Sequence, residues 1–323
     1  MSVLPFQLES KKLGLGWLVH VLILMLLCGA VVIFPDYYRM LSTEAILLAV
    51  FAMSLDLIMG YAGIASFGHA AYFGAGGYSL AMILLHVTQS VWIALFAAAV
   101  VAGLLALFVG VVSIRARGIY FAIMTLAFGE VLYRIVFHTP ALGGSDGLIG
   151  IPMPKLNLIF VDVDLRKPLN FSLVAVVFAY VSFLVSRRIV NSPFGRVLKG
   201  IKDNEDRIPF LGYDPRRYKI IAFTISGILA GLSGALFSLF KTFAVTEQLG
   251  FMESGKVIVM TLLGGLGTLI GPMIGAIFIT FFETILSSYM ESYQIVTGIL
   301  FILVVLFFRK GLWGLLLWVR KER

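Results

Sequence analysis

Long uncharged apolar runs alternate with short polar segments along most of the chain. A helix needs roughly 20 predominantly apolar residues to cross the hydrocarbon core of a bilayer. The pattern therefore predicts an all-α polytopic membrane protein with about ten transmembrane crossings. The predicted spans are residues 14–35, 44–61, 67–86, 91–113, 118–138, 169–187, 219–241, 255–270, 272–289 and 292–309.

Basic residues beside the spans predict how the chain is oriented, because lysine and arginine accumulate on the cytoplasmic side of membranes. Of the 25 lysines and arginines, 18 fall in four clusters that are separated by even numbers of predicted spans. We therefore expect a single transmembrane domain over residues 1–323, with both termini cytoplasmic and an external loop at 139–168. The clusters are Lys11 and Lys12, Arg115 and Arg117, the loop 187–219, and the group Arg309, Lys310, Arg320, Lys321 and Arg323.

Composition argues against soluble classes of protein. Hydrophobic residues make up 60% of the 323 residues and charged residues 13%, whereas soluble domains contain roughly 25% charged residues. The net charge of +8 does not indicate nucleic-acid binding, because the basic residues lie beside apolar runs. No phosphate-binding loop, metal-ligand spacing or catalytic group can be placed. We expect a chain that is not an enzyme and binds no cofactor or metal itself.

Two glycine-rich segments, residues 60–78 and 264–275, interrupt the otherwise ordinary spans. Such a density of small residues has two interpretations. It either allows close helix packing, or it breaks helices so that backbone groups line a cavity. Paired broken segments in the two halves of a transporter point to a substrate site, which favours the second interpretation.

Ionisable residues inside the predicted spans are few, and each is a functional candidate because burying a charge in a bilayer is costly. Asp56 and Glu283 either act in transport or serve as hydrogen-bond partners between helices. Glu130 and Arg134 are four residues apart on one helix face, which predicts an ion pair with a structural role. His69 follows a glycine and either lines a cavity or packs in the core. The full set is Asp56, His69, Glu130, Arg134, Lys241 and Glu283.

The longest polar interruption, residues 187–219, contains nine of the 25 lysines and arginines. Ser192 followed by Pro193 is a helix start signal. Apolar residues then recur at helical spacing, which predicts a short amphipathic helix over Pro193–Ile208 that ends near Pro209. Asp214 provides a second start signal for the next span. The short helix is either a solvated surface element or the docking site of a soluble motor.

At these residues the chain resembles a known family, the permease subunits of ABC importers for branched-chain amino acids, in the LivM branch of the LivH/LivM group. The resemblance extends from about Leu41 to Trp313. The stretches that carry it are Gly60–Tyr78, Arg115–Val131, Gly143–Pro152, Ser192–Gly234 and Val259–Gly275.

The resemblance implies a subunit of an importer in the bacterial inner membrane, without an ATPase site of its own. Its partners would be a sister permease, two cytoplasmic ATPase subunits that use ATP and magnesium, and a periplasmic binding protein, in contact with membrane lipids and not with nucleic acid. The predicted short helix would be the coupling helix that fits the ATPase. Its coupling residues would be Pro193, Gly195, Arg196, Lys199, Lys202, Asn204, Glu205 and Gly212.

A branched-chain amino acid would need a path with small residues, apolar walls and exposed backbone N–H groups, and the N-terminus of a broken helix would face its carboxylate. The candidate path residues are Ser66, Gly68, His69, Phe73, Glu130, Gly264, Gly265, Gly267 and Thr268.

Other functions stay open at this point. Residues 206–210 depart from the alanines common in the family, and residues 207–214 are also similar to urea permeases, so urea, amides or aromatic acids are alternative substrates. A proton-coupled secondary transporter, with Asp56 or Glu130 carrying protons, is an alternative from another class. A membrane scaffold that transports nothing is a third.

Overall fold

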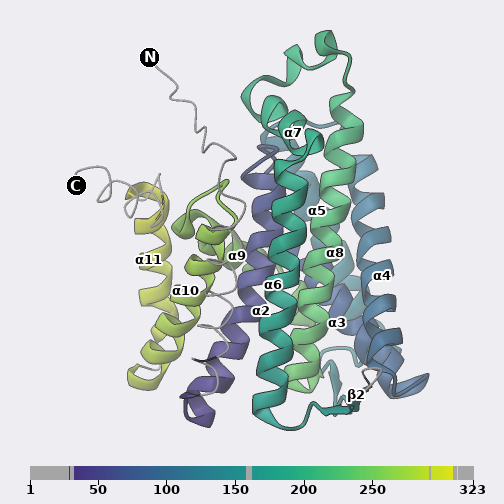
Figure 1. Ribbon diagram of the computed structural model, residues 1–323, viewed down its shortest axis with the longest axis vertical. Helices are drawn as coiled ribbons and strands as arrows, with labels where there is room; N and C mark the ends of the chain where they lie inside the picture. The colour runs from purple at the N-terminus through teal and green to yellow at the C-terminus, as the bar shows by residue number, and fades with distance from the viewer. Residues whose placement is uncertain (1–28, 30–32, 158–161, 291, 308–310, 312–323) are drawn as a thin grey trace, which may run out of the picture.

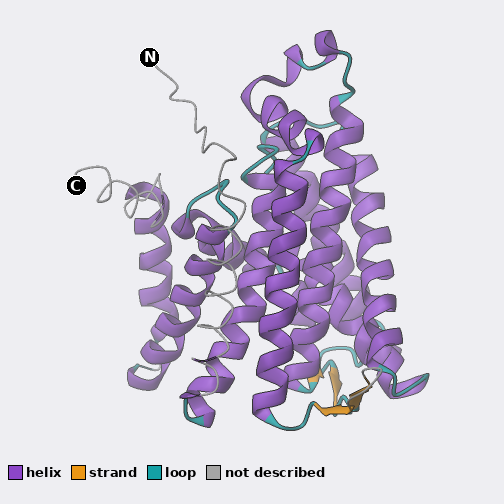
Figure 2. Cartoon of the chain, in the orientation of Figure 1, coloured by secondary structure: helices purple, strands orange, loops and turns teal. Residues whose placement is uncertain are grey.

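The computed structural model describes residues 29, 33–157, 162–290, 292–307 and 311. Long helices form a bundle, with a helical loop at one end and short strands at the opposite end (Figure 1, Figure 2). We call these the α7 end and the strand end. The predicted first span lies almost wholly outside the described residues, and Lys11, Lys12 and the whole C-terminal basic group lie outside them.

Helices dominate the described chain, and successive helices of the bundle run in alternating directions between its two ends (Figure 1). Six of them, α2, α4, α5, α6, α8 and α10, are long and apolar enough to cross a membrane. This confirms a predominantly helical protein with several membrane-spanning candidates. The helices are α2 (Asp36–Met59), α3 (His69–His86), α4 (Val91–Ser113), α5 (Ile119–Phe137), α6 (Pro168–Asn191), α7 (Pro193–Asn204), α8 (Pro215–Lys241), α9 (Phe251–Gly264), α10 (Ile270–Tyr289) and α11 (Tyr293–Phe307).

Two small antiparallel sheets at the strand end correct the expectation of an all-α fold. One joins β1 (Leu148–Ile149) to β4 (Phe243–Ala244), and the other joins β2 (Lys155–Asn157) to β3 (Asp162–Asp164). In β2 only the central residue is buried, the period-two pattern of a strand with one face on protein. The predicted external loop therefore folds as a small cap over the helix ends (Figure 2).

Two helix starts differ from the sequence prediction. Helix α2 begins at Asp36 rather than at residue 44, directly after Pro35, and Asp36 pairs with Arg39 one turn later. Helix α9 begins at Phe251 rather than at residue 255 and ends at Gly264. In both cases polar residues in the first turn resemble a loop in sequence, although acidic groups are favourable at a helix N-terminus.

The centre of the bundle is α8, which packs most extensively on α3 and α4. Glycine permits this approach, because a Cβ atom on Gly76 of α3 would lie 2.0 Å from the carbonyl oxygen of Gly231 in α8. Buried hydroxyls join α8 to α2 as well: Ser233 donates to the carbonyl oxygen of Leu47 at 2.6 Å. Small residues and polar bonds of this kind hold helices together where lipid offers no hydrophobic driving force.

We expect Gly76→Val to separate α3 from α8 and to destabilise the protein by about 3 kcal/mol, the upper range for overpacking a core. Gly298→Val in α11 is the matched control, because nothing lies within 4 Å of a Cβ atom there. Thermal unfolding of both variants in detergent micelles measures the difference. Equal unfolding temperatures for the two variants would contradict the packing argument.

Candidate functional site

The first glycine-rich segment leaves helical geometry between α2 and α3. Helix α2 ends at Met59, and the chain then turns back at Gly63, whose φ of 71° lies in the left-handed region. Helix α3 starts only at His69. Residues 60–68 therefore form an irregular half-pass that leads from the α7 end into the bundle, and α3 continues to the strand end (Figure 1). Residues 60–68 are thus broken, as one interpretation predicted, whereas Gly76 lies in α3 and packs closely on α8, as the other predicted.

The second glycine-rich segment is a tight corner between α9 and α10. Gly265 and Gly267 have φ angles of 112° and 76°, and Leu269 also has a positive φ of 60°. Thr268 closes the corner, because its Oγ1 donates to the carbonyl oxygen of Gly265 at 2.9 Å and accepts from the Gly271 N–H at 2.9 Å. We call residues 265–269 the α9–α10 corner.

The two segments meet at Asp56, which is fully buried near the end of α2. Its Oδ1 accepts from the N–H of Gly267 at 2.7 Å, and its Oδ2 accepts from the N–H of Leu269 at 2.9 Å. Gly60 fits beside this bond because a Cβ atom there would lie 2.4 Å from the nitrogen of Gly267. Asp56 is thus a hydrogen-bond partner between elements, one of the two roles the sequence left open.

A second meeting point lies deeper in the bundle, where α3 and α9 both begin. The N–H of Ala70 in the first turn of α3 donates to Oγ of Ser254 in the first turn of α9 at 3.0 Å. The rings of Phe67 and Phe251, next to the two starts, stack with centroids 6.3 Å apart. In the second half of the chain, α9 is the helix that begins inside the bundle, and it starts at Phe251. The glycine-rich segment 264–275, where the sequence predicted the break, lies at the other end of α9.

The predicted path residues of the first segment lie around this meeting point and are buried. His69 Nε2 is 2.9 Å from Oγ of Ser54, and its ring stacks on Phe51. Among the described residues, Oγ of Ser66 and Nδ1 of His69 have no hydrogen-bond partner. Phe73 is buried in the core, and Gly68 lies against the carbonyl oxygen of Thr125 in α5.

The remaining predicted path residues lie elsewhere. Gly264 ends α9 against Gly271, so Gly264, Gly265, Gly267 and Thr268 gather at the α9–α10 corner and not with Ser66. Glu130 accepts from Nε of Arg134 at 2.9 Å, which confirms the predicted ion pair. Their side chains are 43% and 63% exposed on the outer face of α5.

Sequence reasoning missed part of a charge cluster that links four helices. Lys256 of α9 pairs with Glu283 of α10 at 2.6 Å, and Lys241 of α8 pairs with Glu44 of α2 at 2.8 Å. Glu253, one turn before Lys256, also acts electrostatically on it. Glu253 was overlooked because the start of α9 was placed too late, whereas Glu44 and Lys256 lie within predicted spans and were not recognised as candidates. An acidic residue in the first turn, Glu253, was the signal that marks the start of α9.

The basic loop forms helix α7 with the predicted start. Ser192 caps it by accepting from the N–H of Gly195 at 3.4 Å, and Asp214 caps α8 by accepting from the N–H of Arg216 at 3.0 Å. The helix ends at Asn204 rather than at Ile208, because Asn204 adopts an extended conformation with φ −161°. Two short 3₁₀ helices follow, Glu205–Arg207 and Pro209–Leu211, and Gly212 ends the second with a positive φ.

The predicted coupling residues divide between two sides of α7. Gly195 is buried with the apolar side of the helix, whereas Pro193, Arg196 and Lys199 are exposed. Lys202 donates to the carbonyl oxygen of Gly60 at 2.6 Å. 

The loop is tied to its neighbours by ion pairs. Glu205 is engaged in a partly buried ion pair with Lys219. Asp206 accepts a hydrogen bond from Arg117 at 2.8 Å, and this bond raises the pKa of Arg117.

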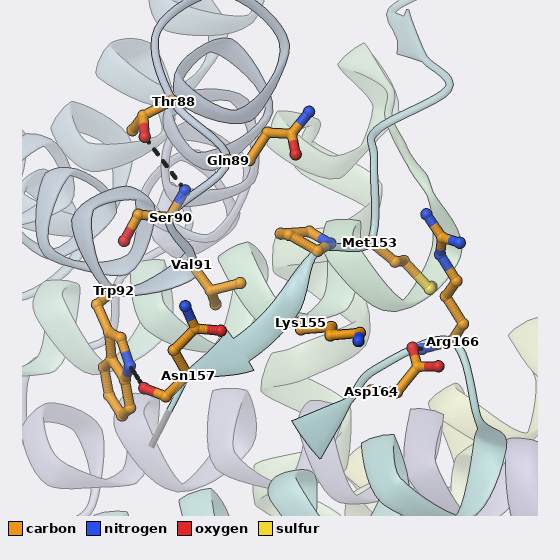
Figure 3. A pocket seen from close by; sticks show the side chains of 11 residues that line it. Thr88, Gln89, Ser90, Val91, Trp92, Met153, Lys155, Asn157, Asp164 and Arg166 are labelled. Atoms are coloured by element: carbon orange, nitrogen blue, oxygen red, sulfur yellow. Dashed lines mark hydrogen bonds between the residues drawn. The ribbon is translucent and has the colours of Figure 1, made fainter. Parts of the chain in front are cut away.

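A pocket of about 510 Å³ opens at the strand end between the α3–α4 connection and the β2–β3 hairpin (Figure 3). Trp92 forms one wall and donates from Nε1 to the carbonyl oxygen of Asn157 at 2.9 Å. Lys155 and Arg166 lie on the other side (Figure 3). The sequence analysis did not identify this pocket.

Several membrane-spanning helices, with two helices that begin inside the bundle, define a multi-pass membrane protein of the transporter class. A family model described as "Branched-chain amino acid transport system / permease component" matches residues 37–305, and the chain belongs to this family. Together these findings place it in the bacterial inner membrane as a permease component that is not itself an enzyme.

Individual relatives agree with the family. The chain is 27% identical over 292 residues to the high-affinity branched-chain amino acid permease LivM of Escherichia coli K12, covering 84% of this chain and 69% of the relative. It is 27% identical over 284 residues to the probable LivM of Methanocaldococcus jannaschii, covering 77% and 81%. It is 29% identical over 125 residues to LivH of E. coli K12, covering 38% and 40%. No solved structure matches the chain.

We expect Lys256→Met to lower stability by on the order of 3 kcal/mol, because it leaves the partly buried carboxylate of Glu283 without its partner. The double variant Lys256→Met with Glu283→Leu should recover most of this loss. Arg217→Met, which breaks an exposed pair with Asp214, is the control and should cost less than about 1 kcal/mol. Unfolding in detergent measures the stability of all three variants. If Lys256→Met lost no more stability than Arg217→Met, the Lys256–Glu283 pair would not contribute as proposed.

Proposed function

We propose that the chain is the transmembrane permease subunit of an ATP-driven importer that translocates branched-chain amino acids. The observation that carries this proposal is the meeting of α3 and α9, whose first turns are joined inside the bundle by Ala70 and Ser254. Broken helices whose N-termini face an interior region are typical of transporter substrate sites. The LivM and LivH relatives, which transport branched-chain amino acids, support this substrate class.

The α7 end faces the cytoplasm in this proposal. Helix α7 and its flanking segments carry the largest group of basic residues in the chain, and basic loops remain on the cytoplasmic side. The strand end is then external. With the first predicted span added to the described helices, the chain makes about ten crossings and has both termini in the cytoplasm.

The substrate path passes the starts of α3 and α9. Helix N-termini carry partial positive charge, which suits the carboxylate of an amino acid. Phe67 and Phe251 offer apolar surface for its side chain, and Met252 beside them is 83% exposed. We retain Ser66, Gly68, His69 and Phe73 as path residues because they surround the start of α3, where Ser66 has no hydrogen-bond partner in the described structure.

The outer face of α5 is proposed to meet the sister permease. The side chains of Glu130 and Arg134 are partly exposed on an otherwise apolar helix, and a charge within a span is placed against protein or water rather than lipid. Gly129, next to Glu130, packs on Gly68 at the start of α3. The substrate path is proposed to run from the starts of α3 and α9 along the side of α5 that carries Glu130, with Gly264, Gly265, Gly267 and Thr268 at its cytoplasmic mouth.

The free energy of ATP hydrolysis is proposed to reach the permease through α7. The family consists of permease components, and the described chain holds no nucleotide-binding motif, so ATP would be hydrolysed on other subunits. Two cytoplasmic ATPase subunits, which use ATP and magnesium, are proposed to bind the exposed side of α7 at Pro193, Arg196 and Lys199. A periplasmic binding protein is proposed to deliver substrate to the strand end. These partners are the general complement of an ABC importer.

Two alternatives from the sequence lose their support. The departure from the family at residues 206–210 lies at the α7 end and is exposed except at Ile208, whereas the starts of α3 and α9 meet within the bundle. It therefore gives no reason to prefer urea as substrate. The two oxygens of Asp56 accept from two backbone N–H groups, and Glu130 accepts from Arg134, which favours fixed acceptors over proton carriers.

We expect proteoliposomes that contain the full complex to take up labelled leucine only with ATP and with the external binding protein. Omitting the ATPases or the binding protein should abolish uptake, whereas a proton uncoupler should leave it unchanged. The measurement is the initial rate of leucine accumulation, with labelled urea as the competing substrate. Uptake that survives ATP removal and is stopped by the uncoupler would overturn the proposal in favour of a secondary transporter.

We expect Arg196→Glu to release the ATPase subunits, because it reverses the charge on the exposed side of α7. Lys167→Glu, an equally exposed reversal at the strand end, is the matched control and should retain them. Co-purification of ATPase with tagged permease measures the result. Glu205 is unsuitable for this test, since its reversal would also break the ion pair with Lys219. Normal ATPase recovery with Arg196→Glu would remove α7 as the docking helix.

A further inference from the structure

We propose that Lys202 and Asp56 form a relay that transmits displacement of α7 to the α9–α10 corner. The inference rests on the proposed function, because an ATPase must move α7 for the relay to act. Both are positioning residues, since they act through backbone groups and not on the substrate. The relay consists of Lys202, the backbone of Gly60, the side chain of Asp56, and the backbone N–H groups of Gly267 and Leu269.

The first contact joins α7 to the interrupted segment after α2. Nζ of Lys202 donates to the carbonyl oxygen of Gly60 at 2.6 Å. The aliphatic part of the same side chain lies against Gly63, where an added Cβ atom would be 3.2 Å from Cγ of Lys202. One lysine thus holds both sides of the turn that begins the irregular half-pass, so α7 and this turn move together.

The second contact joins that turn to the corner in the other half of the chain. The N–H of Gly60 donates to the carbonyl oxygen of Asp56 at 2.8 Å, and the carboxylate of Asp56 holds Gly267 and Leu269. The ammonium of Lys202 also acts electrostatically on Asp56. Two hydrogen bonds to a buried carboxylate are strong, because at least one partner is charged and water is excluded.

Backbone strain makes the conformation of the corner sensitive to the hydrogen bonds from Asp56. Leu269 has φ 60° and ψ −47°, a conformation that a residue with a Cβ atom rarely adopts. Its N–H is bound by Asp56, and Ile270 starts α10 directly after it. Such a conformation persists only while its surroundings impose it. A shift of Asp56 would therefore release the corner into a second conformation.

The corner is connected to the proposed substrate path by a rigid element. Helix α9 has 14 residues and runs from the corner at Gly264 to Phe251 at the meeting point with α3. A helix of that length spans about 21 Å and moves as a unit. Displacement at the corner therefore reaches the first turn of α9 and the bond between Ser254 and Ala70.

The test compares Lys202→Met and Asp56→Asn in the assembled complex. We expect leucine taken up per ATP hydrolysed, measured per bound ATPase, to fall by about tenfold in each variant, the factor expected for one lost hydrogen bond to a charged group. Lys202→Arg keeps a donor and should rescue part of the ratio. Asp203→Asn, the exposed neighbour, is the matched control and should keep the full ratio. A variant with an unchanged ratio would overturn its residue's place in the relay.

A second readout follows the corner directly. Leu266, 37% exposed within the corner, is replaced by cysteine in a Cys28→Ser background, and its rate of reaction with a maleimide is measured with and without ATP. ATP should change this rate in the parent and not in Lys202→Met, which tests the relay even if Asp56→Asn fails to fold. An ATP-dependent change that persists in Lys202→Met contradicts the relay alone. Loss of ATP-dependent uptake in the parent contradicts the proposed function instead.

Discussion

The arrangement of the two glycine-rich segments depends on the hydrogen bonds that the carboxylate of Asp56 accepts. A backbone N–H group that leaves a helix inside a membrane protein must find its acceptor within the protein, because the hydrocarbon offers none. Gly267 and Leu269 are two such groups, and one side chain satisfies both. The corner can therefore turn sharply while these N–H groups stay bonded, and the two halves of the chain are joined at the point where each departs from helical geometry.

The same constraint explains why small and hydroxyl-bearing residues fill the centre of the bundle. Backbones that approach as closely as Gly76 and Gly231 leave no room for side chains. Hydroxyl groups such as Ser226, which donates to the carbonyl oxygen of Ser54, supply polar bonds across the helix interfaces. The charged pairs between α9 and α10 and between α8 and α2 complete this framework. The starts of α3 and α9 are thus supported from several sides.

Much of the fold was predictable because its signals are local. Helix α4 has the predicted bounds 91–113, since its apolar residues are continuous, and Ser192 and Asp214 cap helices where their sequence context indicated. Non-local features were not predictable. Asp56 binds residues more than 200 positions later, and no spacing rule connects them. The start of α9 was also misplaced, because Glu253 resembles a loop residue until Lys256 and Glu283 are seen beside it.

The way α7 is attached to the bundle gives its motion a direction. Ser192 alone separates it from α6, in an extended conformation with ψ 170°, whereas two 3₁₀ helices and a glycine turn separate its other end from α8. In the proposed mechanism, a displacement imposed by the ATPases would rotate α7 about Ser192. Lys202 lies about 15 Å along it at 1.5 Å per residue, so a rotation of about 10° would carry Lys202 nearly 3 Å. Lys202, in the last turn of α7, is the residue that donates to the carbonyl oxygen of Gly60.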